Sequence, residues 1–597
     1  MPLASSNKAS ESGLGMRNSM GRGIVGRYRT WAICGVLWGI TLATHGQSST
    51  GPVAIGDIEQ REAQQRKERE EALNRLNVPR PDVRLPSAAL ADTPSRWPVE
   101  TPCFPIREVV LTGDARTAFA WLPEMLNTGP GALNGQCLGP QGINQVQARM
   151  QNALIDQGWI TTRVVVPDQD LSNGQLTLQI VPGRLQAIRM ADGKPVPAMV
   201  KHALPLQPGE LLNLRAIEQA LENLKRVPSQ EADLQIEPAS GPGSQAGDSN
   251  LVVTLHSVRP WRLSTFADDS GSEPTGKLQG STTVSYDAPL QLNDLLYLSL
   301  NHSLGEVPGD ATGTRGHTVH YSLPHRWWLF TATHSSSRYR QAIAPGALYA
   351  GQSSQTEARA DRMIYRDART KVSVAGGFWF KSARNFINDT EIELQRRRTA
   401  GWLIGLDAQT ATDSLQLRGN AEFRRGTGAS ASLAAPEEPN GDGSSRFQVL
   451  TAQIQVSTPW RIAHTNVQFR SHWKLQVHGS RLPSPERFAI GGRHTVRGFD
   501  GTHTLTGDSG VITRNEVSIP VSGWQAQAYG ALDAGMVSGP ASHGVGAGRT
   551  LAGGALGLRG QLMGTIGYDL FAGHPLRQPS NMPTGGLTGG FSLNVSY

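Results

Sequence analysis

The sequence predicts a transmembrane β-barrel of about 16 antiparallel strands, preceded by two small α/β domains and a highly charged N-terminal helix. Three observations carry this prediction. Apolar and polar residues alternate repeatedly after Arg259, two α/β patterns of similar build precede that point, and an export signal stands at the N-terminus. At 597 residues the chain is too long for one ordinary domain. Its 38% hydrophobic content is well below that of a helical membrane protein.

Residues 1–46 predict a secretory signal peptide. The continuous apolar run from Trp31 to Ala43 is shorter than the roughly 20 residues that a spanning helix needs. Arginines precede this run and small residues follow it, in the order typical of signal peptides. A single membrane anchor is the alternative interpretation. In an exported protein, the two cysteines outside the predicted signal peptide, Cys103 and Cys137, favour one disulfide over two unpaired thiols.

Residues 47–77 contain a highly charged segment, Ile55 to Asn77, that predicts a single helix. Glu62 and Arg66 are spaced i,i+4 with the acid first, which is the favourable order for an isolated helix. Few apolar residues interrupt the charge, so this helix is either a solvated arm or a segment inside a water-filled pore. Prolines recur through residues 78–102, which predicts an extended linker.

Residues 103–183 and 184–258 predict two successive α/β units that look like an internal duplication. Strands and a helix of the first unit are expected at residues 106–111, 141–157, 162–166 and 175–181. Those of the second unit are expected at residues 185–190, 215–225, 234–237 and 251–256. The helices are predicted from apolar residues that recur at the 3.6-residue period. Neither unit contains a cluster of residues suited to catalysis.

Residues 259–597 predict the barrel. From Val467 to Val477 one face is largely apolar, whereas the other face is polar and includes Arg470 and Lys474. Alternation alone is also compatible with a soluble β-sandwich. A barrel is favoured because the polar faces are heavily charged over many strands, as a wet lumen requires. The roughly 340 residues, at about 20 per strand and connection, then give about 16 strands.

The end of the chain agrees with a barrel that stops on its last strand. Four apolar and aromatic residues alternate with polar residues there: Phe591, Leu593, Val595 and Tyr597. We interpret this pattern as an aromatic C-terminal signal for barrel insertion. A barrel satisfies every backbone hydrogen bond in lipid without an exposed sheet edge.

Five blocks of sequence together resemble one family. They are CFPIREVVLTGD from Cys103, DQGWITTRVVVPDQDLSNGQLTLQIVPGRL from Asp156, LNLRAIEQALENLKRVPS from Leu212, DDSGSEPTGKLQGSTTVSYDAPLQLNDLLYLSL from Asp268, and RFAIGGRHTVRGFDG from Arg487. The set is similar to the TpsB transporters of two-partner secretion (ShlB/FhaC/HecB-like haemolysin secretion/activation proteins) and covers nearly all of the mature chain. The resemblance implies a 16-stranded barrel, two periplasmic polypeptide-transport-associated (POTRA) domains and an N-terminal helix that plugs the pore.

The resemblance also implies a lumenal loop with a VRGF tip. The matching residues here are Val496, Arg497, Gly498, Phe499, Asp500 and Gly501. A lumenal guanidinium needs a carboxylate partner because it stays charged and presents five donors. The residue that matches the partner position of the family is Asp533. The alternative is that Arg497 is an ordinary arginine at a loop turn.

The function implied by the resemblance is secretion of an unfolded partner exoprotein, with an N-terminal secretion domain, across the outer membrane of a Gram-negative bacterium. Expected partners are that exoprotein, outer-membrane lipid, periplasmic chaperones and the barrel-assembly machinery. The alternative is a factor that inserts other proteins into the outer membrane. We expect no enzyme activity, no catalytic residue, no cofactor and no metal site, because the sequence has no metal-ligand cluster, nucleophile elbow or phosphate loop. The modest net charge of +7 does not argue for nucleic acid.

Overall fold

The computed structural model describes residues 55–86, 91, 93–94, 96–128, 131–133, 135–305, 312–540, 549–580, 582 and 584–597. The predicted signal peptide therefore lies outside the described residues, as does the start of the predicted plug region. Of the helices that are described, none combines the length and apolar character needed to cross a membrane.

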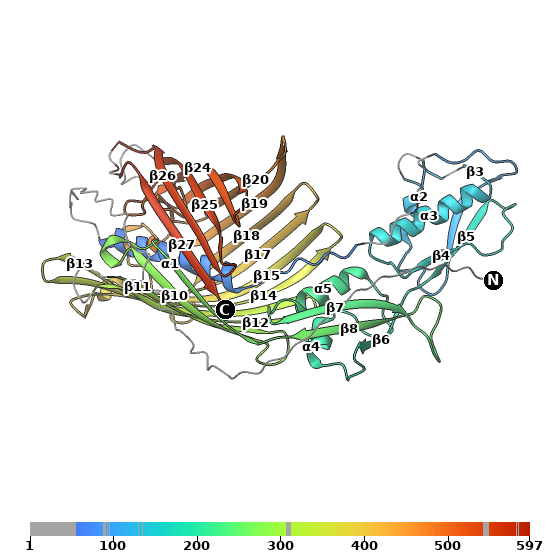
Figure 1. Ribbon diagram of the computed structural model, residues 1–597, viewed down its shortest axis with the longest axis horizontal. Coiled ribbons are helices and arrows are strands. Elements are labelled where there is room, and N and C mark those ends of the chain that lie inside the picture. Colours follow the sequence, from blue (N-terminus) through green and yellow to red (C-terminus); the bar gives the residue numbers. More distant parts are fainter. Residues whose placement is uncertain are drawn as a thin grey trace, which may run out of the picture. The chain divides into compact units, whose positions relative to one another are not determined.

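The charged segment forms helix α1, Ile55–Asn77, with the bounds that the sequence predicts. It ends where Pro79 and Pro81 remove backbone donors and disfavour helical geometry in the preceding residues. Several of its polar side chains are nevertheless buried, among them Arg61 and Glu62. Figure 1 shows α1, in blue, within the ring of strands. Of the two alternatives, the structure therefore shows the helix inside the pore.

The first α/β unit is built around a three-stranded sheet in the order β2-β5-β4, in which β2 and β5 are parallel. Its elements are β1 Phe104–Pro105, β2 Glu108–Thr112, α2 Trp121–Leu126, β3 Cys137–Leu138, α3 Pro140–Asp156, β4 Arg163–Val165 and β5 Gln175–Val181. Apolar residues of α3 pack on the sheet, with Val146, Met150 and Leu154 fully buried. The helix thus buries the face that its 3.6-residue period predicts.

The second α/β unit repeats this topology, with the sheet order β6-β8-β7 and β6 parallel to β8. Its elements are β6 Leu185–Met190, α4 Ala198–Ala203, α5 Leu214–Leu224, β7 Gln230–Pro238 and β8 Ser249–Ser257. The side chain of Asn213 caps α5 by accepting a hydrogen bond from the Arg215 backbone N–H. The sequence did not predict α2 and α4, because a helix of six residues is too short to show a clear period.

Sixteen long antiparallel strands of the described residues close into a barrel, in which β27 pairs with β9 (Figure 1). They are β9 Trp261–Asp268, β10 Leu278–Asp287, β11 Leu295–Leu304, β12 Gly313–His325, β13 Trp328–Ala344, β14 Ala347–Arg366, β15 Thr370–Ile387, β17 Arg397–Ala411, β18 Gln416–Thr427, β19 Gln448–Ile462, β20 Thr465–His478, β23 Ser509–Val521, β24 Ala526–Ser538, β25 Thr550–Leu562, β26 Ile566–Arg577 and β27 Thr588–Ser596. The two-residue strand β16, Thr390–Glu391, adds to β15. The predicted fold class is confirmed.

The alternation predicted for β20 separates an outer face from a lumenal face. Trp473, Leu475 and Val477 are exposed on the outside, whereas Lys474 between them bonds to α1 in the lumen. Because successive side chains of a strand point to opposite faces, the same division holds along the neighbouring strands. The barrel therefore presents apolar residues to lipid and polar residues to its interior.

The last residue lies one position beyond β27 but still continues the ladder. Tyr597 donates its backbone N–H to the Leu263 carbonyl and accepts from the Leu263 N–H, at 2.9 and 3.1 Å. The Arg259 guanidinium lies 4.2 Å from the Trp261 ring and 4.3 Å from the Tyr597 ring. The first and last strands are thus joined up to the end of the chain.

Candidate functional site: a plugged pore with a lumenal loop

Polar contacts tie α1 to the barrel wall along its length. Towards its C-terminal end, the Tyr297 hydroxyl donates to Asn74 at 2.6 Å and the Ser264 hydroxyl donates to Asn77 at 3.0 Å. Further contacts join Glu71 to Lys474, Arg66 to Ser337 and Ser353, Glu62 to Thr275, and Arg61 to Gln341. Hydrogen bonds and ion pairs of this kind can be exchanged for water. Ile58 and Leu73 add buried apolar side chains to this mainly polar contact.

Arg397 joins the N-terminal end of α1 to two extracellular loops. Its Nε lies 2.8 Å from a Glu59 oxygen, and its Nη1 and Nη2 each lie 2.6 Å from an oxygen of Glu437. Glu437, in the loop between β18 and β19, also accepts from the Ser484 hydroxyl at 2.8 Å. The Arg397 guanidinium therefore links the plug to the β18–β19 loop directly and, through Glu437 and Ser484, to the β20–β23 loop.

The wall and α1 do not fill the lumen. A cavity of about 1280 Å³, which includes open solvent, lies between α1 and strands β12 to β17. Serines and arginines make up much of its lining, including Ser337, Ser353 and Arg397. Polar side chains of the wall therefore face the lumen beside the plug.

The loop between β20 and β23 contains a short hairpin, β21 Phe488–Ile490 with β22 Leu505–Gly507, and carries the VRGF tip between its strands. Val496 and Phe499 are buried in an apolar cluster with residues of the hairpin and of the barrel wall. Two residues of the motif thus fix the tip against the wall by packing.

Arg497 makes the pair with Asp533 that the resemblance implies. Its Nε and Nη2 donate to the two carboxylate oxygens of Asp533 at 2.7 and 2.8 Å, and its backbone N–H donates to the same carboxylate at 3.0 Å. The remaining Nη1 donates to Glu516 at 3.0 Å. Both Arg497 and Asp533 are almost fully buried. A bidentate contact of this kind specifies orientation as well as attraction.

Glycines in the tip and in the barrel wall allow the backbone of the tip to approach the strands closely. Gly498 has φ +104°, and a Cβ there would lie 2.6 Å from the His574 carbonyl. A Cβ on Gly553 of β25 would meet the Arg497 carbonyl, and one on Gly573 of β26 would lie 2.8 Å from the Gly498 nitrogen. The backbone of the tip therefore lies directly against two glycine positions of the barrel.

The structure does not bring every predicted motif residue into this contact. Asp500 is exposed and accepts a hydrogen bond from the Thr502 backbone N–H, while Gly501 occupies a turn at φ +83°. Sequence reasoning did not identify Glu516, Gly553 or Gly573. Glu516 faces the lumen on β23, the strand that pairs with the strand of Asp533. This position is the one signal that could have indicated Glu516 from the sequence.

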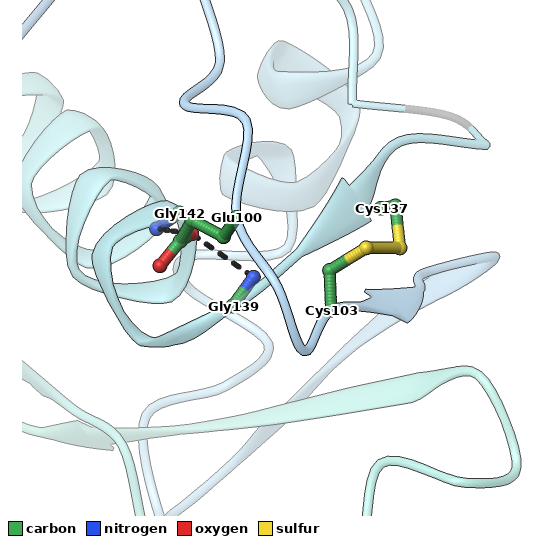
Figure 2. Close-up of a disulfide and its surroundings, with 5 residues drawn as sticks. All are labelled: Glu100, Cys103, Cys137, Gly139 and Gly142. Atoms are coloured by element: carbon green, nitrogen blue, oxygen red, sulfur yellow. Dashed lines mark hydrogen bonds between the residues drawn. A yellow bond between two sulfur atoms is a disulfide. The ribbon is translucent and has the colours of Figure 1, made fainter.

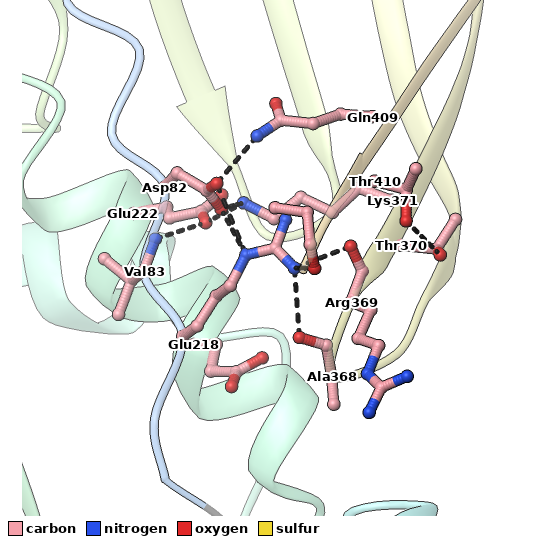
Figure 3. A network of polar contacts seen from close by, with 12 residues as sticks. Asp82, Val83, Glu218, Glu222, Ala368, Arg369, Thr370, Lys371, Gln409 and Thr410 are labelled. Carbon is pink, nitrogen blue, oxygen red and sulfur yellow. Dashed lines mark hydrogen bonds and ion pairs between the residues drawn. The ribbon is translucent and has the colours of Figure 1, made fainter. Parts of the chain in front are cut away.

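The linker after α1 is held between the second α/β unit and the barrel (Figure 3). Glu222 of α5 accepts from the Val83 backbone N–H at 2.9 Å and also pairs with Lys371 of β15. Asp82 pairs with Lys371 at 2.5 Å. Burial raises the pKa of Asp82, but the hydrogen bonds and charges of Lys371 and Arg84 outweigh it, so this pKa lies below its usual value.

A parallel set of contacts lies beside this one. Glu218 of α5 accepts from the Leu85 backbone N–H at 2.9 Å and pairs with Arg366 at 3.2 Å. His202 of α4 and His325 of β12 are also in contact, with 3.0 Å between their Nδ1 atoms. The second α/β unit is therefore joined to the periplasmic end of the barrel by charged and aromatic side chains.

The two cysteines form a disulfide in the first α/β unit, between Cys103 and Cys137 (Figure 2). Beside it, Glu100 accepts backbone N–H donors of Gly139, Gln141 and Gly142 at the start of α3. Partial burial raises the pKa of Glu100, but these three donors outweigh it and hold the pKa below its usual value. The end of the linker is thus fastened to this unit covalently and by a helix cap.

In the part of the chain that the structure describes, no group of three or more histidine, cysteine or acidic residues could hold a metal ion. Several charged side chains of the lumen pair with one another or with α1, as Arg359 does with Glu422 and Lys474 with Glu71. The arrangement therefore consists of a lumen lined by polar side chains, a helix that occupies it and a loop fastened to its wall.

Family profiles match three consecutive segments of the chain. Residues 247–560 match the family described as haemolysin secretion/activation protein ShlB/FhaC/HecB. Residues 104–183 match a ShlB-type POTRA domain and residues 184–238 match a POTRA domain. These segments correspond to the barrel and to the two α/β units.

Curated relatives are similar over most of their length. The outer membrane transporter CdiB-2 of Burkholderia pseudomallei is 32% identical over 591 residues, covering 94% of this chain and 98% of the relative. The hemolysin transporter protein ShlB of Serratia marcescens is 26% identical over 430 residues, covering 70% of this chain and 73% of the relative.

A solved structure agrees with these matches. CdiB from Acinetobacter baumannii superposes with a TM-score of 0.79 at 29% identity, covering 92% of this chain and 100% of that chain. The predicted resemblance is confirmed, and it excludes an enzyme. The chain belongs to the haemolysin secretion/activation protein family ShlB/FhaC/HecB and is an outer-membrane transporter of two-partner secretion with two periplasmic POTRA domains.

Proposed function

We propose that this transporter conducts an unfolded partner exoprotein through the barrel lumen, and that α1 must leave the lumen before the partner can pass. The observation that carries the proposal is the mode of binding of α1. Its contacts with the wall are largely hydrogen bonds and ion pairs, such as those of Glu59 with Arg397 and of Asn77 with Ser264, although Ile58 and Leu73 are buried as well. Each of these polar groups can be satisfied by water or by a passing polypeptide backbone once the helix leaves.

A reversible covalent bond between α1 and the wall tests this proposal. The double variant Asn77→Cys/Ser264→Cys places two thiols where the side chains are now in hydrogen-bond contact. We expect the oxidised variant to insert normally but to export no partner and to show no opening events in a planar bilayer. A reductant should restore both activities.

The matched controls are the single variant Ser264→Cys and the wild type, each with and without the reductant. The wild type controls for reduction of the native disulfide between Cys103 and Cys137. Export at the wild-type level by the fully oxidised double variant would overturn the proposal, because the partner would then pass while α1 stays in place.

We also propose that the POTRA domains recruit the partner through its N-terminal secretion domain. An unfolded segment can add to an exposed sheet edge through main-chain hydrogen bonds, and side chains around the edge would then select the partner. Deletion of residues 184–258 should abolish export while leaving the barrel inserted. Normal export after this deletion would refute the recruiting role.

The proposal includes two further partners, periplasmic chaperones and the barrel-assembly machinery. Periplasmic chaperones would keep the exoprotein unfolded, and the barrel-assembly machinery would insert this chain. The insertion signal is proposed to be Phe591, Leu593, Val595 and Tyr597, which follow one another on one face of the C-terminal segment. If the chain instead inserted other proteins, its deletion would deplete the outer membrane of unrelated barrels, whereas we expect loss of one exoprotein.

A further inference from the structure

A row of polar side chains crosses the outer surface of β11 to β15. The register places His302 opposite Arg315, Arg315 opposite Arg338, Arg338 opposite Gln352, and Gln352 opposite Arg384. All five residues are exposed. We refer to these five residues as the arginine row.

The arginine row faces away from the lumen. Ser337 and Ser353, the neighbours of Arg338 and Gln352 along their strands, both accept hydrogen bonds from Arg66 of α1. Because side chains alternate along a strand, Arg338 and Gln352 must point outward. Residues that lie opposite one another in a ladder share a face of the sheet, so the other members of the row point outward as well.

The row also lies near the extracellular ends of the strands. Strand β9 follows β8 of the second POTRA domain, so the start of β9 is at the periplasmic end and the ends alternate along the barrel. His302 is close to the end of β11, Arg315 is close to the start of β12, and Arg384 is close to the end of β15. Charged groups on the outer face are tolerated there because their cost falls towards the membrane interface.

Among the described residues no ion pair joins Arg315 or Arg338 to a carboxylate, whereas Arg384 lies within electrostatic range of Glu391. Arg315 and Arg338 lie directly opposite each other, an arrangement in which like charges repel. The neighbouring Arg340 pairs with Asp389 and Arg396 pairs with Glu391, so these two carboxylates of the described residues are already engaged. An anion from outside the chain would remove this repulsion.

The outer face of β20 to β25, on another flank of the barrel, differs in charge from the arginine row. At the corresponding ends of β20 to β25 the register aligns Leu475, Val511, Met536 and Thr550 on the outer face. That row is neutral. The basic character is therefore a property of the β11–β15 flank and not of every extracellular strand end.

We propose that the arginine row binds the phosphate groups of lipopolysaccharide, the phosphorylated glycolipid of the outer leaflet. A guanidinium donates two parallel hydrogen bonds to phosphate, which an ammonium cannot do. Adjacent strands lie about 4.8 Å apart, so the distance from Arg315 to Arg384 is about 14 Å. The row is therefore long enough to hold more than one phosphate of a single headgroup. This inference is independent of the plug mechanism, because the side chains of the row point away from the lumen that holds α1.

A triple variant tests the proposal in the purified full-length transporter. We expect Arg315→Gln/Arg338→Gln/Arg384→Gln to retain roughly tenfold less lipopolysaccharide per chain than the wild type after detergent exchange, measured by native mass spectrometry. A matched control removes the same charge from exposed positions of the POTRA domains, by Arg107→Gln/Arg116→Gln/Arg189→Gln. The control should retain the wild-type amount.

Three further measurements distinguish the source of the phosphate and the state of the barrel. The wild-type transporter should retain little dephosphorylated lipopolysaccharide and little phosphatidylglycerol, no more than the Gln variant retains of native lipopolysaccharide. Inorganic phosphate should not displace bound glycolipid from the wild type. The variant Arg315→Lys/Arg338→Lys/Arg384→Lys keeps the charge and should retain an intermediate amount. Both triple variants should show the heat-dependent gel shift of a folded barrel.

Two results would overturn the proposal. One is equal retention of native lipopolysaccharide by the wild type and by a folded Gln variant. The other is equal retention of phosphorylated and dephosphorylated lipopolysaccharide by the wild type. If the Gln variant does not fold, the comparison between the wild type and the Lys variant decides, because equal retention by these two would show that the guanidinium geometry is not used.

Discussion

The POTRA domains and the barrel place the same kinds of residues on opposite sides. In the first POTRA domain Met150, Leu176 and Leu178 are fully buried in one apolar cluster. In the barrel, Leu300 and Leu556 are 56% and 73% exposed, and they point away from the lumen. The difference follows from the surroundings: the POTRA domains meet water, whereas the outer face of the barrel meets hydrocarbon.

The interior of each region is held together differently as a result. The lumenal wall contains ion-pair networks such as that of Arg359 with Asp361, Asp407 and Glu422. The POTRA domains are held by apolar clusters and, in the first domain, by a disulfide. The effect of a substitution should therefore depend on which face of which region it changes.

The largest effect is expected at the lumenal pair. Asp533→Ala leaves the buried Arg497 guanidinium without its bidentate partner, which costs roughly 3–5 kcal/mol for a buried pair. We expect the VRGF tip to detach and export to fall by more than tenfold, measured by secretion of the partner and by protease cleavage in residues 491–504. Asp500→Ala, at an exposed motif position, is the control. Protection of the loop and normal export in the Asp533 variant would contradict the prediction.

The next effect is confined to the first POTRA domain. The double variant Cys103→Ser/Cys137→Ser removes a disulfide with a sequence separation of 34 residues, worth about 3–4 kcal/mol in the loop-entropy account. We expect faster amide hydrogen exchange throughout residues 104–183 and unchanged exchange in the barrel. An equal increase in both regions would show that the two are not independent in stability.

Two leucine-to-alanine substitutions, one in each region, test this dependence on surroundings directly. Leu176→Ala empties a fully buried position in the first POTRA domain and should cost at least about 2 kcal/mol. Leu300→Ala changes a lipid-facing position, where the lost contact is replaced by lipid, so its cost should be much smaller. Chemical denaturation followed separately in each region measures both values. A larger cost for the lipid-facing variant would contradict this dependence.

The smallest effect concerns pH. The pKa of Glu100 is lowered in the folded protein because three backbone donors outweigh its burial, so its stabilisation is present above the unfolded pKa and is lost as the pH falls through the folded pKa. Exchange of the amides at Gly139, Gln141 and Gly142 should therefore become less protected at acid pH. In Glu100→Gln this added pH dependence should be absent. Identical acid profiles in the two proteins would contradict the assignment.

Much of the fold could be predicted from the sequence because it depends on local periodicity. Helix α1 has the predicted bounds, and β5 and β6 match their predicted ranges. Strand β7 is longer than predicted, running over Gln230–Pro238, because its first half pairs with the end of β8 and needs no apolar run of its own. Ladder pairing is a relation between strands, and one strand alone does not reveal it.

The residues of the lumenal site likewise fall into those that the sequence indicated and those that only the structure revealed. The sequence resemblance indicated Arg497 and Asp533 because the motif and its partner stand at matching positions. Glu516, Gly553 and Gly573 were not indicated, since their roles depend on what lies opposite them across the lumen. A glycine on a strand has no distinguishing sequence context, and here its function is to leave room for another segment's backbone.

The order of the domains, the helical or strand periodicity of each segment and the family could be inferred from the sequence, because they depend on side-chain type and spacing along the chain. The strand that closes the barrel, the wall residues that hold α1 and the arginines that lie side by side on the outer face could be seen only in the folded protein. Strand register and closure set the distances between residues far apart in the sequence, and no local pattern encodes those distances. Side chains such as Arg315 and Arg338 become neighbours only when their strands pair.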